Sequence, residues 1–116
     1  RAMVEHEPGF RPLVGIPPKP EGMWGIVAGH GLVQADERPT HHSSPMAPSE
    51  LAAIDWDYVA LGHFHGHRVV QEEPVLAVYP GATASSLKGQ PGAVVVSLEP
   101  GSPASIRWLA LELPDR

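Results

Sequence analysis

The 116-residue sequence contains no cysteine, and this absence excludes two kinds of structure at once. Neither disulfides nor thiolate metal sites can form, so histidine, aspartate and glutamate are the strong metal ligands that remain. Without a disulfide framework nothing indicates secretion, and we expect a cytoplasmic protein. The sequence also lacks a run of about 18 apolar residues and a basic segment leading into an apolar one, so it predicts neither a membrane helix nor a signal peptide.

Basic residues are scarce. Eight lysines and arginines stand against 13 acidic residues, which gives a net charge of −5, and only two of the basic residues are lysines. A protein that grips duplex DNA through its phosphates normally presents a clustered basic face, and no such cluster occurs here. This segment is therefore not expected to hold nucleic acid by itself, although a basic surface elsewhere in a longer protein or on a partner would allow it. The sequence predicts no membrane partner and leaves the oligomeric state open.

The most informative feature is an apolar strand that runs into two histidines. Residues 57–61, Asp-Tyr-Val-Ala-Leu, are followed by Gly62-His63-Phe64-His65. Side chains at positions i and i+2 of a strand project to the same face, and just past a strand end both imidazoles can point into one cleft. Glycine tolerates positive φ and close approach of the backbone to a ligand, so we expect Gly62 to be the hinge of this turn.

A second segment repeats the design further upstream. An apolar strand over 23–29 leads into His30, which has a glycine on each side. Neutral imidazole is a good ligand for Mn, Fe, Co, Ni and Zn. The candidate metal ligands are therefore His30, His63 and His65. The competing interpretation is that they are ordinary turn histidines, and the case for His30 depends on the other two.

Other polar residues are candidates for the rim of a substrate cleft. His67 extends the histidine run, and the segment 81–86 offers backbone amides and hydroxyl groups that could contact a phosphate or a sugar. The same composition is typical of any loop. The pair at 41–42, in a Ser-, Thr- and Pro-containing stretch, predicts a solvated loop. The candidate rim residues are His67, Gly81, Thr83 and Ser85.

Together these segments resemble a known family. A strand ending in His-Gly, followed later by Asp-Tyr-Val-Ala-Leu and Gly-His-Xaa-His, is similar to the C-terminal half of the calcineurin-like metallophosphoesterase superfamily. The segment Tyr79-Pro80-Gly81-Ala82-Thr83, with Lys88-Gly89 and the valine-rich strand after it, is most similar to the branch that holds SbcD-type DNA-repair nucleases and related phosphodiesterases.

The resemblance implies a fold, a reaction and a ligand set. The fold would be α/β, the β-rich C-terminal part of a two-sheet metallophosphoesterase sandwich. The reaction would be hydrolysis of a phosphodiester or phosphomonoester at a centre of two divalent metals, with manganese the first choice and iron, zinc, cobalt or nickel as alternatives. Two metals about 3.5–4 Å apart can clamp the attacking and leaving oxygens. His30 and His63 would bind the second metal and His65 the first.

The family's N-terminal motifs, Asp-Xaa-His, Gly-Asp and Gly-Asn-His, do not occur in this sequence. We therefore expect residues 1–116 to be the C-terminal portion of a single domain, with the catalytic residues and the bridging aspartate in an absent N-terminal half. The chain alone would then be inactive. Two alternatives stay open, an SbcD-like DNA nuclease and, in another class, a non-catalytic β-rich binding or scaffold domain.

The pattern of apolar runs and Gly/Pro boundaries predicts a mostly β structure. We expect a short strand near 2–6, loops over 8–20 and 34–48, and one short helix near 49–54 with Ser49 as its N-cap. Two hairpins should follow, one turning at Glu72-Glu73-Pro74 and one at the turn 100–103. The remaining strands are predicted at 23–29, 57–61, 68–71, 75–79, 93–99 and 105–113.

Overall fold

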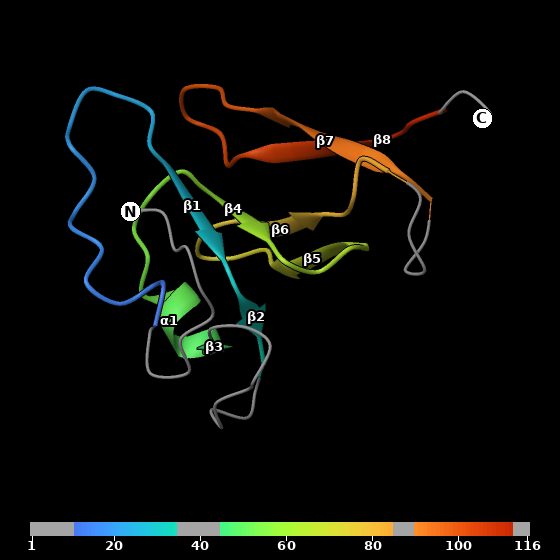
Figure 1. The fold of residues 1–116 in the computed structure, drawn as a ribbon. Helices are drawn as coiled ribbons and strands as arrows, with labels where there is room; N and C mark the ends of the chain where they lie inside the picture. The colour runs from blue at the N-terminus through green and yellow to red at the C-terminus, as the bar shows by residue number, and fades with distance from the viewer. Residues whose placement is uncertain (1–10, 35–44, 85–89, 113–116) are drawn as a thin grey trace.

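The computed structural model describes residues 11–34, 45–84 and 90–112, and shows a strand-rich α/β domain with several small sheets (Figure 1). Its elements in chain order are β1 (Ile26–His30), β2 (Leu32–Val33), β3 (Pro45–Met46), α1 (Pro48–Ala52), β4 (Tyr58–Gly62), β5 (His67–Gln71), β6 (Ala77–Pro80), β7 (Gly92–Ser97) and β8 (Ser105–Ala110). The strand expected near 2–6 lies outside the described residues.

The main sheet has four strands in the order β1-β4-β6-β5. Strands β1, β4 and β6 are parallel to one another, and β5 is antiparallel to β6. Parallel neighbours require crossover connections, and the chain between β1 and β4 supplies one that contains α1. Because β1 and β4 run in the same direction, the residues that follow them emerge at the same edge of the sheet.

The predicted strand 23–29 exists, but it begins and ends later than predicted, at Ile26 and His30. A Cβ atom at Gly25 would lie 2.5 Å from both Lys19 and the Trp56 ring. These two side chains therefore cover the backbone at Gly25, one residue before β1 begins to pair with β4. The residues before it, at 23 and 24, are largely exposed. At its other end the strand continues into His30, which therefore lies within the sheet ladder.

The short helix is confirmed, but its predicted start was wrong. Helix α1 spans Pro48–Ala52, and its N-cap is Ala47 instead of Ser49. Proline fits the first helical position because its φ is already helical and it lacks an N–H that would be unpaired there. The Glu50 carboxylate accepts a hydrogen bond from the Ala47 amide at 2.7 Å and forms an ion pair with Arg11 at 2.6 Å. Glu50, the third residue of the helix, therefore fixes the start of the helix.

Strands β2 and β3 were not predicted. Each has two residues, and they pair in parallel as Leu32↔Pro45 and Val33↔Met46. A two-residue strand is too short to show the alternation on which strand prediction depends. The pairing places the chain that follows His30 beside the chain that enters α1.

Both predicted hairpins are confirmed. Strands β5 and β6 are antiparallel, with an irregularity between Val69 and Gln71, and β7 and β8 pair over six positions from Gly92↔Ala110 to Ser97↔Ser105. The second hairpin forms its own two-stranded sheet and contacts the main sheet at β6.

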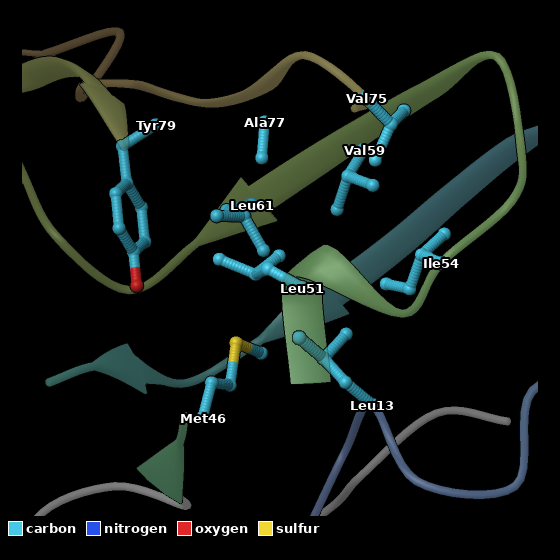
Figure 2. Close-up of a cluster of buried hydrophobic side chains, with 9 residues drawn as sticks. All are labelled: Leu13, Met46, Leu51, Ile54, Val59, Leu61, Val75, Ala77 and Tyr79. Atoms are coloured by element: carbon cyan, nitrogen blue, oxygen red, sulfur yellow. The ribbon is translucent and has the colours of Figure 1, made fainter. Parts of the chain in front are cut away.

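The hydrophobic core lies on one face of the main sheet (Figure 2). Side chains two apart on β4 and on β6 point to this face, and the helix, the N-terminal loop and β3 cover it. On β1, Val27 packs against the same cluster, so residues 26, 28 and 30 face the other way and are exposed. The buried cluster consists of Leu13, Met46, Leu51, Ile54, Val59, Leu61, Val75, Ala77 and Tyr79.

No helix in the described part of the chain is long and apolar enough to cross a membrane.

Candidate metal centre

The two predicted histidine turns lie side by side. His30 is the last residue of β1 and pairs in register with Gly62, the last residue of β4. The Gly31 amide then donates to the Gly62 carbonyl at 3.1 Å, which extends the parallel ladder one step beyond the strands. The parallel pairing therefore brings His30 and His63 to the same edge of the sheet, as the sequence predicted.

Gly62 leaves space for the His30 ring. A Cβ atom built on Gly62 would lie 3.3 Å from Nδ1 of His30, which is tighter than nine in ten real Cβ contacts, so the ring would have to shift by a few tenths of an ångström. The His30 imidazole therefore lies over the backbone of the neighbouring strand, on the sheet face opposite the hydrophobic core.

The prediction that Gly62 is the positive-φ hinge of the turn was wrong. The positive φ belongs to His63, at +124°, the one non-glycine residue with a positive φ among the described residues. Such conformations cost of order 1–3 kcal/mol in a residue with a side chain, and they persist where the surrounding structure holds them. The half-buried His63 is thus held in a strained backbone conformation at the end of β4.

The rings of His30 and His63 are close enough to share one metal ion. Their centres are 5.4 Å apart and their planes stand at 84°. With a metal–nitrogen bond of about 2.1 Å, each ring centre lies about 3.2 Å from the ion, and two rings at a tetrahedral angle have centres roughly 5.2 Å apart. The donor chemistry and the separation both fit a divalent metal. An edge-to-face ring contact without metal also falls in this distance range.

His65 lies on the same turn, two residues beyond His63, and its side chain is exposed. Its carbonyl oxygen accepts a hydrogen bond from the Ala82 amide at 3.1 Å, so the backbone of this turn is fixed. In the described ranges no three His, Asp or Glu side chains gather into a group that could hold a metal. The structure thus brings two of the three predicted ligands together, and the role of His65 stays a prediction.

Tyr79, a residue to which the sequence analysis gave no role, anchors the chain that follows His30. Its hydroxyl donates to the carbonyl oxygen of Gly31 and accepts from the Val33 amide at 3.0 Å. The side chain is almost fully buried, with 1% exposed. Burial raises the pKa of the Tyr79 hydroxyl above 10.0, and the Val33 hydrogen bond and Arg68 act in the opposite direction.

His67 has partners away from the other two rings. Its Nδ1 donates to the carbonyl oxygen of Tyr79 at 3.2 Å, and its ring stacks on Trp108 with centres 5.9 Å apart. The hydrogen bond joins β5 to β6, and the ring stack joins β5 to the β7–β8 hairpin. They give His67 a structural role, and its predicted role at the substrate rim stays a prediction.

The predicted rim loop packs directly against the histidine turn. A side chain at Gly81, where φ is +91°, would meet the backbone of Gly66 and His67 at 3.2 Å, so glycine is required for this close approach. Thr83 is exposed and available to solvent. Ser85 lies outside the described residues, as do the histidines at 6, 41 and 42.

Searches of protein-family models and of curated proteins find no match to this sequence.

Proposed function

We propose that this chain is part of a metal-dependent phosphoesterase of the calcineurin-like superfamily, in which His30 and His63 bind one divalent metal ion. The observation that carries the proposal is the meeting of these two imidazoles, 5.4 Å apart, at the ends of adjacent parallel strands. The two residues come from distant positions in the sequence, and the motif similarity predicts both as metal ligands.

The residues around the pair have roles that suit ligand binding. Gly62 leaves room for the His30 ring, and the strained backbone at His63 turns that side chain toward it. Strained backbone conformations cluster at active and ligand-binding sites, where the fold holds a side chain in a required position. His30 is exposed at the end of β1, so a substrate can reach its ring.

A divalent ion at this position would supply a Lewis acid for a phosphoryl oxygen and lower the pKa of a bound water toward neutrality. The chain's own contribution is to hold two neutral nitrogen ligands in fixed positions. A complete centre needs more, because a two-histidine pair leaves positions for carboxylate and further histidine ligands. We propose that His65 binds the other metal of the pair, the first, and that the remaining ligands and the catalytic residues lie outside the described residues.

The substrate class is a phosphoester, and a nucleic-acid substrate has less support. The chain carries a net charge of −5, and its sequence contains no cluster of lysines and arginines with which to hold a polyanion. An SbcD-like nuclease would have to bind DNA through other parts of the protein. The proposal therefore names phosphoester hydrolysis and leaves the choice between a small phosphoester and DNA to substrate profiling.

Paramagnetic titration with Mn²⁺ tests the proposed ligands directly. In the 116-residue chain labelled with ¹⁵N-histidine, we expect Mn²⁺ to broaden the ring signals of His30 and His63 at concentrations that leave His67 sharp. His67 is the matched control because it is an exposed histidine of the same sheet with its own structural partners. His63→Ala should abolish the selective broadening at His30.

Equal broadening of all histidine rings, or none at His30 and His63, would reject the metal site. It would favour the alternative class, a non-catalytic β-rich binding or scaffold domain in which the two rings make an ordinary edge contact. We also expect no turnover from the 116-residue chain alone, because a dinuclear centre needs a bridging carboxylate. Metal-dependent hydrolysis of bis(p-nitrophenyl) phosphate by the purified chain would contradict that expectation.

A further inference from the structure

Tyr79 contacts both histidine-bearing turns. Its hydroxyl donates a hydrogen bond to the Gly31 carbonyl and accepts one from the Val33 amide, and so binds the chain immediately after His30 at two points. In Figure 2 the ring lies at one end of the buried cluster with the hydroxyl directed away from β6. With 1% of the residue exposed, water cannot readily replace these hydrogen bonds.

The same side chain also reaches the second turn. The Tyr79 ring packs edge-to-face against Phe64, with centres 5.8 Å apart and planes at 70°. Phe64 is the residue between His63 and His65, and it is half-buried against the core. Aromatic pairs in this arrangement prefer a defined geometry, so the contact restricts where the His63–His65 turn can lie.

We propose that Tyr79 is the positioning residue that sets the distance between His30 and His63. Through its hydroxyl it fixes the turn after β1, and through its ring it fixes the turn after β4. Backbone hydrogen bonds also hold these turns, from the Gly31 amide to the Gly62 carbonyl and from the Ala82 amide to the His65 carbonyl. Tyr79 adds a side-chain contact to each turn. The purpose of this positioning, metal binding, rests on the proposed function.

Tyr58 offers a matched comparison. It is also buried, at 3% exposed, and burial raises the pKa of its hydroxyl as it does for Tyr79. It begins β4 and pairs with Ile26, at the opposite end of the strand pair from His30 and Gly62. Removing the Tyr58 hydroxyl therefore perturbs a buried tyrosine of the same sheet without touching the histidine turns.

The test compares Tyr79→Phe with Tyr58→Phe in two measurements. In the metal-free protein, nuclear Overhauser effects between the His30 and His63 rings should weaken in Tyr79→Phe and persist in Tyr58→Phe. In a Zn²⁺ titration, Tyr79→Phe should lower the affinity about tenfold, the low end of the loss seen when groups supporting a metal ligand are removed, and Tyr58→Phe should leave it unchanged.

A second variant tests the ring contact and covers the case in which Tyr79→Phe does not fold. Phe64→Leu keeps the Tyr79 hydroxyl but removes the aromatic contact, so it should displace the His63 ring while the hydrogen bonds at Gly31 and Val33 persist. If the nuclear Overhauser effects between the His30 and His63 rings are unchanged in both Tyr79→Phe and Phe64→Leu, Tyr79 does not have the positioning role. If the wild-type protein binds no Zn²⁺ at these histidines, the proposed function fails, and the ring-to-ring effects still decide the role of Tyr79.

Discussion

Replacing His63 with glycine should stabilise the protein relative to alanine at the same position. His63 has a φ of +124°, a conformation that side chains rarely adopt and glycine adopts freely. Both variants lose the imidazole, its contact with His30 and any metal ligation. The difference between them therefore isolates the backbone strain at this position.

The expected magnitude follows from two opposing effects. At an ordinary position, alanine is more stable than glycine by about 0.4–1 kcal/mol, because glycine loses more conformational freedom on folding. At positive φ the strain of order 1–3 kcal/mol affects alanine alone. The strain is the larger of the two, so the order should reverse, with His63→Gly more stable than His63→Ala by about 1 kcal/mol.

Urea unfolding of four variants measures this reversal. His67→Gly and His67→Ala are the control pair, because His67 lies in strand β5 and has no positive φ. There we expect alanine to be the more stable residue by about 0.4–1 kcal/mol. If alanine is also the more stable residue at 63, the turn does not hold His63 in a strained conformation and the argument from strain fails.

Three further predictions concern the site and its support. Gly62→Ala should displace the His30 ring by a few tenths of an ångström, because the new Cβ would lie 3.3 Å from Nδ1 of His30. A crystal structure of the variant should show the displaced ring, and a Zn²⁺ titration should show weaker binding than in the wild type. The two buried tyrosines, whose pKa values are raised by burial, should contribute stability that is complete below pH 10.0 and lost as the pH rises through their folded pKa values. Urea midpoints measured from pH 8 to 12 should fall above pH 10.0, and less steeply in the Tyr79→Phe and Tyr58→Phe variants. In the full-length phosphoesterase that we propose, His63→Ala or His65→Ala should lower bound metal and turnover with little change in melting temperature. Alanine at 41 or 42 should change neither bound metal nor turnover. The opposite result would mean that the wrong histidines were assigned.

The sequence was sufficient to locate the longer elements and the meeting of His30 with His63. An apolar strand of five residues between glycine and proline boundaries leaves few alternatives, and two parallel strands present the residues after them at the same edge. The short pairing of β2 with β3 could not be predicted, because two residues carry no periodicity. The start of α1 was misplaced because serine is a good N-cap, whereas the structure uses Pro48 and the reach of Glu50 back to Ala47.

Within the site, the geometry of the turn could not be predicted from residue types. Glycine is the residue expected at a positive φ, yet His63 has the positive φ, and Gly62 leaves space for the His30 ring. Tyr79 received no role because its partners are backbone groups 46 and 48 positions away, and backbone groups leave no signature in a sequence. The assignment of His65 depends on groups outside the described residues, so the structure does not test it.

Anomalous diffraction from crystals of the chain grown with Zn²⁺ would test the central claim most directly. Data collected on both sides of the zinc absorption edge locate the ion independently of any ligand assignment. We expect one anomalous peak about 2.1 Å from a ring nitrogen of His30 and of His63 at the same time. Zinc bound at other residues, with the His30 and His63 rings in contact and no peak between them, would contradict the proposed metal site.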